Sequence, residues 1–356
     1  MTELPQVIVD PSFRSMGDVF SPADMARLVE AVEVVWGRDE PMPEDAFHAA
    51  LPHAFAVVTS GWRYGPVLGE AESLRAILTV SGGWPPELDY GYCFERGIRV
   101  LSAAPAFAGA VAEMALGLAL ACGREIAAGD RAIREGTETW LSAADSLGTF
   151  LLYGKLVGLV GFGNIGTRLR ALLEPFGCDV QAYDPWLTDA YLRHEGVEPV
   201  ALPRLLETSR VIFVLATPTS ENSALLSREL LELVRPDAVL VLVSRAHVVD
   251  FDALTELVLA GRFRAGIDVF PAEPLDGEHP IRAAAGAVLS PHRAGLVQEA
   301  LWELGRLVVD DLEAMTRGLP PRRMQLAEPE LATRYVRTTQ LVQRAKPDPA
   351  GVGGDA

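Results

Sequence analysis

One short segment constrains the fold of this chain more than any other. An uncharged apolar run, Leu156–Val160, leads into a glycine-rich hexapeptide, and residues 167–176 then follow a helical period that ends at Gly177. The hexapeptide is Gly161-Phe162-Gly163-Asn164-Ile165-Gly166. Its first glycine permits a tight turn, its second lets the backbone approach a ligand closely, and its third lets the helix pack on the strand. Strand, turn and helix in this order predict the first unit of a doubly wound parallel sheet.

The turn after Val160 is suited to bind an anion, because a helix N-terminus offers free N–H groups and the positive end of the helix dipole. The next predicted strand, Val180–Asp184, ends in a carboxylate that can accept hydrogen bonds from both ribose hydroxyls and would repel a 2′-phosphate. The nearest basic residue downstream, Arg193, stands too far along the chain to be an obvious phosphate clamp. These residues predict NAD rather than NADP as the cofactor. The alternative interpretation is that the glycines form a purely structural turn and that Asp184 is an ordinary surface residue.

Two series of apolar runs alternate with segments of helical period, which is typical of α/β domains. The first series is Val7–Val9, Val32–Trp36, Phe55–Val58, Ala76–Val80 and Ile98–Leu101, and the second continues with Val211–Leu215, Val239–Val243, Arg264–Asp268 and Ala287–Leu289. The length of 356 residues also favours two domains. We predict two doubly wound parallel sheets. Residues 1–105, completed by 297–340, form a flavodoxin-like substrate domain, and 106–296 form a Rossmann NAD-binding domain. The residues 341–356, rich in Pro and Gly, are predicted to be a disordered tail.

Two helices can be placed from the sequence. The segment Ser21-Pro22-Ala23-Asp24 supplies an N-cap, a proline at the first helical position and an acid three residues after the cap. The apolar face that follows is Met25, Leu28, Val29 and Val32. A longer helix of about Ala108–Ala127, followed by a loop-rich stretch at 129–152, overlaps the most apolar segment, Ala104–Gly123. We expect it to be buried inside the protein or at a subunit interface rather than to span a membrane, because Glu113 lies at its middle.

Charge and cysteine content narrow the choice of partner and compartment. The formal net charge of −17 repels phosphate backbones and anionic lipid headgroups, so we expect neither nucleic acid nor membrane as a partner. Cys93, Cys122 and Cys178 are an odd number of cysteines at unrelated spacings, which predicts free thiols rather than a disulfide or a metal site. The segment Met1–Asp10 lacks the pattern of a signal peptide, and together these features predict a cytoplasmic protein.

Three ionisable residues stand near the ends of predicted strands in the second domain, where open α/β sheets bind their ligands: Arg245, Glu273 and His292. Arg245 could hold a substrate carboxylate through two hydrogen bonds. A glutamate bonded to one ring nitrogen of His292 would fix the tautomer, so that the other nitrogen could protonate a carbonyl. Taken singly, each residue has a plainer reading, as a surface arginine, a solvated glutamate and a structural histidine.

From about Ala76 to Pro320 the chain resembles the D-isomer-specific 2-hydroxyacid dehydrogenases, relatives of phosphoglycerate dehydrogenase, glyoxylate/hydroxypyruvate reductase and D-lactate dehydrogenase. The ordered motifs that carry the resemblance are Val111-Ala112-Glu113 with Ala115-Leu116, Gly154-Lys155, Val243-Ser244-Arg245, Gly266–Pro274 and Ser290-Pro291-His292. The resemblance implies that Arg245 binds the substrate carboxylate and keto oxygen, that His292 is the acid/base and that Glu273 is its partner. A homodimer and a 2-oxo or 2-hydroxy acid substrate are also implied.

The resemblance further implies two sets of binding residues. The cofactor set is Gly161, Gly163, Asn164, Ile165, Gly166, Asp184, Thr217, Ser244 and Asp268, of which Asp268 would contact the nicotinamide carboxamide. The substrate set adds the backbone N–H groups of Ser81, Gly82 and Gly83 to Arg245. No metal is implied.

The chain also departs from the family pattern. Ala246-His247 follows the arginine where the family usually has glycine, and Thr217-Pro218-Thr219-Ser220-Glu221-Asn222 keeps only part of a common cofactor motif. The side chains of Trp62, Arg63, Tyr64, Trp84 and Arg293 could shape a pocket for a larger or doubly anionic substrate, or could be packing and surface residues. Two other functions use the same fold: a phosphite-type dehydrogenase, and a non-enzymatic NAD-sensing scaffold resembling the C-terminal-binding corepressors. The sequence does not say which 2-hydroxy acid is used.

Overall fold

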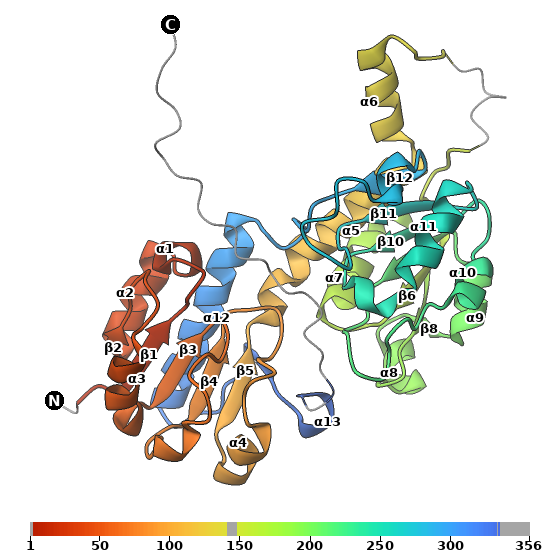
Figure 1. Ribbon diagram of the computed structural model, residues 1–356. Coiled ribbons are helices and arrows are strands. Elements are labelled where there is room, and N and C mark those ends of the chain that lie inside the picture. The colour runs from red at the N-terminus through yellow and green to blue at the C-terminus, as the bar shows by residue number, and fades with distance from the viewer. Residues whose placement is uncertain (1–2, 141–147, 333, 335–356) are drawn as a thin grey trace, which may run out of the picture.

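The computed structural model describes residues 3–140, 148–332 and 334, so the predicted tail at 341–356 lies outside the described residues. The chain forms two α/β domains that lie side by side, and two long helices begin near the points where the chain passes from one domain to the other (Figure 1). These are α5 (Ala108–Gly123) and α12 (Gln298–Thr316). The chain therefore leaves the first domain through α5 and returns to it through α12.

The first domain is built on a six-stranded sheet in the order β13-β5-β4-β3-β1-β2. Its strands are β1 (Gln6–Asp10), β2 (Glu33–Trp36), β3 (Ala56–Thr59), β4 (Ala76–Thr79), β5 (Arg99–Ser102) and β13 (Gln325–Leu326). The first five are parallel in the flavodoxin-like order 2-1-3-4-5. The short β13 pairs antiparallel with β5, so the end of the chain completes the edge of the first sheet.

The second domain is built on a seven-stranded parallel sheet in the order β12-β11-β10-β9-β6-β7-β8. Its strands are β6 (Leu156–Val160), β7 (Asp179–Tyr183), β8 (Glu198–Pro199), β9 (Val211–Val214), β10 (Val239–Leu242), β11 (Arg264–Ile267) and β12 (Ala287–Leu289). The strand order reverses between β6 and β9, which is the point where doubly wound sheets bind their ligands. The predicted fold class, two doubly wound parallel α/β sheets, is confirmed.

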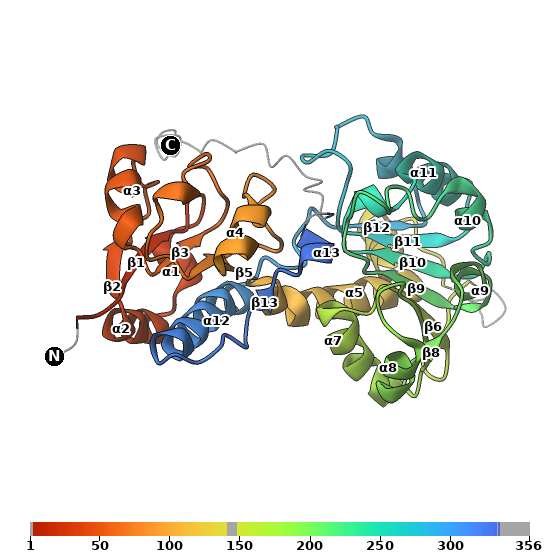
Figure 2. The same ribbon diagram turned by 90° about the horizontal axis from the view of Figure 1, so that it is seen from below.

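Helices cover both faces of each sheet (Figures 1 and 2). The first domain has α1 (Met16–Val19), α2 (Pro22–Ala31), α3 (Glu44–Ala50) and α4 (Tyr90–Arg96), and the second has α7 (Asn164–Leu173), α8 (Asp189–His194), α9 (Leu202–Thr208), α10 (Arg228–Glu232) and α11 (Phe251–Leu259). Ser21 caps α2 as predicted, because its hydroxyl accepts the Asp24 N–H at 3.1 Å. The predicted face of α2 was wrong at Val29, which is 55% exposed because the helix packs through Leu28 instead.

The predicted helix at about 108–127 is in fact two helices. α5 ends at Gly123, and Glu125 adopts a left-handed φ of 53°. A separate helix, α6, runs over Ile126–Glu135 and so extends into the stretch 129–152 that was expected to be rich in loops. The break is tertiary in origin. Arg264 of β11 pairs with the Glu125 carboxylate at 3.0 Å and also donates to the Cys122 carbonyl, so it holds the chain out of helical continuation. Figure 1 shows α6 projecting away from the second domain.

The apolar segment Ala104–Gly123 is long and apolar enough to cross a membrane by length and composition, and half of it is buried inside the protein. Its buried side lies over β10, β11 and α7 and includes Val111, Leu118 and Cys122. As predicted, the three cysteines are free. Burial raises the pKa of both the Cys93 and Cys122 thiols to about 12, so these two groups stay protonated at neutral pH.

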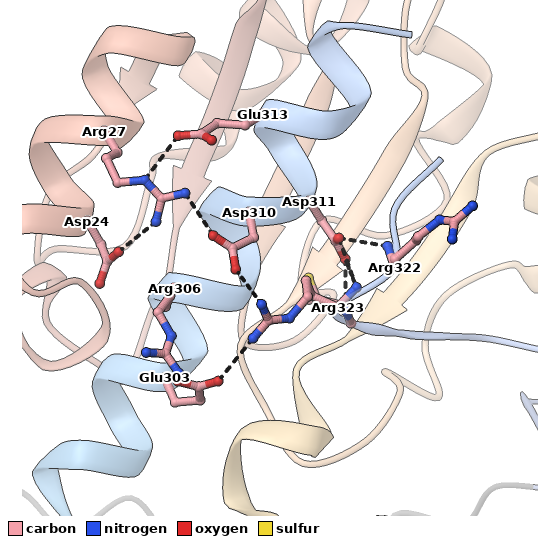
Figure 3. A network of polar contacts seen from close by, with 10 residues as sticks. Asp24, Arg27, Glu303, Arg306, Asp310, Asp311, Glu313, Arg322 and Arg323 are labelled. Carbon is pink, nitrogen blue, oxygen red and sulfur yellow. Dashed lines mark hydrogen bonds and ion pairs between the residues drawn. The ribbon is translucent and has the colours of Figure 1, made fainter. Parts of the chain in front are cut away.

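The returning helix α12 is attached to the first domain by a network of charged side chains (Figure 3). The Arg27 guanidinium on α2 bonds to Asp310 at 2.7 Å and to Glu313 at 3.1 Å, and both acids belong to α12. These bonds raise the pKa of Arg27 above its ordinary value. Asp310 also pairs with Arg323 at 3.0 Å, which connects the network to the segment that leads into β13.

Asp311, the residue after Asp310 on α12, is buried and positions the same segment. Its carboxylate is 1% exposed and accepts the backbone N–H groups of Arg322, Arg323 and Met324 at 2.8–3.2 Å. Three buried donors thus depend on one side chain. The turn that precedes β13, and with it the edge of the first sheet, is set by this carboxylate.

We expect Asp311→Ala to lower the free energy of unfolding by about 2–4 kcal/mol, because three buried N–H groups lose their acceptor at once. Chemical denaturation followed by circular dichroism measures the change. Glu207→Ala removes an exposed carboxylate on α9 and serves as the matched control, with an expected change within about 0.5 kcal/mol. Equal stability of the two variants would contradict the assigned role of Asp311.

Candidate active site

The glycine turn after β6 has the geometry that close approach to a phosphate requires. Gly161 has a φ of +95°, and a Cβ there would lie 2.8 Å from the backbone of Ala216 on the loop after β9, so only glycine fits. A Cβ at Gly166 would lie 3.1 Å from the Phe162 ring, within the tight contact between turn and helix. At Gly163, by contrast, a Cβ would meet nothing within 4 Å. The open space lies at the N-terminus of α7, where helix N–H groups can bind a pyrophosphate.

Asp184 follows β7 and is held next to this turn. One carboxylate oxygen accepts the Phe162 N–H at 2.8 Å and the other accepts the Trp186 N–H at 2.9 Å. Each of these hydrogen bonds uses one of the two lone pairs of its carboxylate oxygen. One lone pair on each oxygen therefore remains to accept a ribose hydroxyl. Arg193 is occupied by Asp189 and Glu198, at 3.5 and 3.7 Å, and so is not placed as a phosphate clamp.

Two further features of the second domain fit a bound dinucleotide. The Ser244 hydroxyl, at the end of β10, is buried and has no hydrogen-bond partner within the described part of the chain. A cavity of about 300 Å³ opens beside Asp184 and is bordered by residues of β7, α8 and the segment after β8. Thr217 lies exposed after β9, across the switch point from the glycine turn. These residues fit NAD, with the pyrophosphate at Gly161–Gly166 and the adenosine ribose at Asp184.

The predicted acid/base pair is brought together at the other side of the switch point. Nδ1 of His292, after β12, lies 2.6 Å from Oε2 of Glu273, after β11. Because an ionised carboxylate only accepts hydrogen bonds, Nδ1 carries the proton and Nε2 is free to exchange one. The His292 side chain is 30% exposed, whereas that of Glu273 is 13% exposed. The histidine is therefore the member of the pair that a substrate can reach.

Glu273 is held in its ionised form by its surroundings. Burial by itself would raise the pKa of this carboxyl group, but the hydrogen bonds from His292 and from the Phe270 N–H, together with the charges of His292 and Arg245, lower it overall. The Phe270 N–H bond is 3.0 Å long. Because the pKa lies below its ordinary value, the carboxylate is charged at neutral pH and is protonated only at a more acidic pH than an ordinary glutamate.

Asp268, which the resemblance implied would contact the nicotinamide carboxamide, also anchors the loop that carries His292. Its side chain is fully buried, and its two oxygens accept the backbone N–H groups of Arg293 and Ala294 at 2.9 and 3.1 Å. Its carbonyl accepts the His292 N–H at 2.8 Å. Asp268 thereby fixes the loop on which His292 adopts a left-handed φ of 51°.

Arg245 brings the two domains together. Its Nη1 donates to the Ser244 carbonyl at 2.7 Å, and a Cβ built on Gly82, in the loop after β4, would lie 3.9 Å from its Nη2. That loop is held through its backbone carbonyl groups. The Thr79 hydroxyl donates to the Gly83 carbonyl, and the Ser102 hydroxyl donates to the Ser81 carbonyl. The N–H groups of Ser81, Gly82 and Gly83 donate to no acceptor among the described residues. The guanidinium and these N–H groups can therefore share one carboxylate.

The departures from the family pattern are accommodated locally. Ala246 and His247 form a 3-10 turn with ordinary backbone angles, so the position after Arg245 does not require glycine. The His247 ring lies 3.1 Å from the Thr219 carbonyl and so ties the loop after β10 to the loop after β9. Within the latter loop, the Asn222 amide bonds to both Thr217 and Thr219 at 2.8 Å, which replaces the missing part of the motif.

Most of the aromatic and basic residues considered for a large pocket belong to the core of the first domain. Trp62, Tyr64 and Trp84 are 4–5% exposed, and the Tyr64 ring stacks on Phe47 with centroids 3.5 Å apart. Arg63 is paired with the buried carboxylate of Asp10 at 2.5 Å. Arg63 and Arg293 are the two exposed residues of this set.

Sequence reasoning missed several residues that border the candidate substrate and cofactor sites. Phe107, before α5, lies against both Gly82 and Gly295, where a Cβ would be 3.9 and 3.0 Å from its ring. Trp186 and Arg334 meet at the Asp184 end of the cofactor site, with the guanidinium carbon 5.3 Å from the indole ring centroid. No motif marks Arg334, because its position depends on how the C-terminal segment returns across both domains.

The chain belongs to the D-isomer specific 2-hydroxyacid dehydrogenase family. Residues 116–294 match the model of the NAD binding domain of that family. The chain is 32% identical over 308 residues to D-3-phosphoglycerate dehydrogenase of Mycobacterium tuberculosis, covering 85% of this chain and 56% of that protein. It thus spans about half the length of the phosphoglycerate dehydrogenases that it matches. It is also 30% identical over 302 residues to glyoxylate reductase of Pyrococcus furiosus, covering 83% of this chain and 89% of that protein.

Among solved structures, a phosphoglycerate oxidoreductase from Rhizobium etli shares the whole architecture. The TM-score is 0.80 at 36% sequence identity, with 92% of this chain and 99% of that chain covered. The family model and this structure support the reading of the second domain as NAD-binding. The resemblance inferred from the motifs is therefore confirmed.

We expect the protein to prefer NAD(H) to NADP(H), because the Asp184 carboxylate repels a 2′-phosphate. Asp184→Ala removes this charge and should narrow the preference, because it relieves the repulsion of a 2′-phosphate and removes the acceptor for the ribose hydroxyls of NADH. The ratio of kcat/KM values for the two cofactors measures it. Glu207→Ala, which removes an exposed carboxylate of α9, is the control that should leave the ratio unchanged. Equal wild-type efficiency with both cofactors would show that Asp184 does not select between them.

Proposed function

We propose that the protein is an NAD-dependent D-2-hydroxyacid dehydrogenase, which transfers a hydride between nicotinamide and C2 of a 2-oxo or D-2-hydroxy acid. The observation that carries the proposal is the 2.6 Å contact between His292 and Glu273. Arg245, whose charge acts on Glu273, lies beside Gly82 of the first domain. A proton donor, its fixed partner and a carboxylate clamp are the groups that this reaction requires from the protein.

The residues divide the work of 2-oxo acid reduction. NADH, when bound, supplies the hydride that C2 accepts. Arg245 and the N–H groups after β4 hold the substrate carboxylate, so that the keto oxygen lies near His292. The protonated ring of His292 donates its Nε2 proton to that oxygen as negative charge develops on it. Glu273 keeps the ring oriented and balances its positive charge. In the reverse direction, neutral His292 accepts the hydroxyl proton.

The relatives favour this activity over the two alternatives considered from the sequence. They are named as phosphoglycerate dehydrogenase and glyoxylate reductase, which act on hydroxy or oxo acids, and neither a phosphite-type dehydrogenase nor an NAD-sensing scaffold gains support from them. Glu273 is retained, as hydride transfer to a carbonyl with general-acid help requires. We also propose a cytoplasmic location, which the free thiols of the chain support.

The central test is His292→Ala. We expect kcat for the best 2-oxo acid to fall at least about a hundredfold, because general-acid catalysis is lost, while NADH affinity stays within a few fold. NADH oxidation across glyoxylate, hydroxypyruvate, aromatic, dicarboxylic and phosphorylated 2-oxo acids finds the substrate, and fluorescence titration measures NADH binding. His194→Ala, on the exposed surface of α8, should leave both unchanged.

Two outcomes would count against the proposal. Wild-type turnover by His292→Ala would remove His292 from the reaction, and inactivity of the wild-type protein toward the whole panel would leave it as a binding protein. Glu273→Gln gives an independent reading. Since a neutral amide balances the protonated ring less well, the loss of reductase activity with rising pH should move to lower pH.

We propose further that the protein is a homodimer, formed through α5 and α6. α6 contributes no buried residue, and its Ile126 and Ile133 side chains are 58% and 63% exposed. Trp140, shortly after α6, is 89% exposed. The outward side of α5 carries small residues, including Gly109 and Gly117, that permit close helix approach. A second copy of the chain would cover this apolar surface.

Replacement of Ile126 and Ile133 by glutamate should convert the dimer into a monomer without unfolding it, because charges would then face the interface. Sedimentation velocity gives the mass, and circular dichroism checks the fold. Leu259→Glu, at an exposed position of α11, is the control. A monomeric wild-type protein would contradict the proposal.

A further inference from the structure

The C-terminal segment of the chain crosses from the first domain to the second after β13. α13 (Pro329–Ala332) lies against α4, and Ala327 and Ala332 are buried in the core of the first domain. Arg334 then reaches the second domain. We call Gln325–Ala332 together with Arg334 the C-terminal strap. Figure 2 shows α13 between the two domains.

Four contacts join the strap to the second domain. The Asn164 amide, at the start of α7, donates to Gln325 at 3.4 Å. The Ser220 N–H, after β9, donates to the Arg334 carbonyl at 2.8 Å. The Arg334 guanidinium pairs with Glu221 at 3.1 Å and lies over the Trp186 ring.

These contact points surround one half of the cofactor site. Asn164 belongs to the glycine turn that faces the pyrophosphate. Trp186 follows Asp184 and donates its N–H to the Asp184 carboxylate, which faces the ribose. Ser220 and Glu221 follow Thr217 on the loop across the switch point. In doubly wound sheets the dinucleotide lies in the crevice between these loops. The strap therefore runs along the adenosine and pyrophosphate half and does not reach His292 by any contact among the described residues.

We propose that the C-terminal strap closes over the adenosine half of NAD(H). The contacts of Arg334 with Glu221 and Trp186, which we call the latch, hold it in the closed position. With the latch closed, the first domain supplies the wall of the cofactor site opposite the glycine turn. Entry and release of the dinucleotide then require the Arg334–Glu221 pair and the Arg334–Trp186 contact to open. Arg334 is in this sense a positioning residue, which acts on the cofactor through the loops after β7 and β9.

The contacts of Arg334 with Glu221 and Trp186 are weak enough to break and re-form often. The Arg334 and Glu221 side chains are 41% and 59% exposed, and exposed ion pairs of this kind are weak. A cation over an exposed aromatic ring adds a contribution of similar size. Loss of both should change the opening equilibrium by about threefold to tenfold.

The test is the kinetics of NADH exchange in the full chain, measured by stopped-flow fluorescence without any 2-oxo acid. Arg334→Ala should raise both the association and the dissociation rate constants about threefold to tenfold, so that Kd changes less than either. Glu221→Gln, which keeps the Ser220 backbone contact, should have the same direction of effect, and the double variant should add little to Arg334→Ala. Arg317→Ala, an exposed arginine after α12, should change nothing.

Two outcomes would overturn the proposal. Rate constants within twofold of wild type in both single variants would show that the strap does not limit exchange. A rise in dissociation alone would make Arg334 a static contact of the cofactor rather than a latch. If Arg334→Ala unfolds, as thermal melting would reveal, Glu221→Gln decides by the same criteria. The readout needs no substrate, so its failure leaves the proposed dehydrogenase activity standing.

Discussion

The buried carboxylate of Asp268 is the contact on which the geometry of the active site depends. It stands at the end of β11, where its oxygens accept the N–H groups of Arg293 and Ala294 while its carbonyl accepts that of His292. Three successive residues are thus tied to one position. This anchoring holds His292 in a left-handed conformation and directs Nδ1 at Glu273. These hydrogen bonds thus place the imidazole of His292 beside Glu273.

The meeting of the two domains at the candidate site is a consequence of how the chain passes between them. α5 leaves the first domain, α12 returns to it, and the C-terminal strap crosses once more to the loops of the second domain. The charged network at Arg27 holds α12 against the first domain, and the carboxylate of Asp311 holds the segment that follows α12. Arg245 and Gly82, far apart in sequence, meet as a result. Binding of substrate and of cofactor are therefore both linked to the relative placement of the two domains.

Much of the fold and of the site could be predicted because the responsible signals are local. The strands are short uncharged runs, and errors at their ends amount to a residue or so, as with Val180–Asp184 against β7 at Asp179–Tyr183. Two-residue strands such as β8 and β13 were missed because pairing at a sheet edge defines them rather than their composition. The helix predicted to reach Ala127 stops at Gly123 because Arg264, distant in sequence, binds Glu125.

The sequence by itself determined the glycine turn, its acid partner Asp184 and the identity of Arg245, Glu273 and His292, because each follows a recognisable strand. It could not determine that Asp268 is buried beneath the histidine loop, that Arg63 is paired with Asp10 or that Arg334 lies over Trp186. These outcomes rest on hydrogen bonds and ion pairs between segments that only folding brings together. A side chain's partner, unlike its position after a strand, depends on the whole packed structure, and the tertiary structure alone decides it.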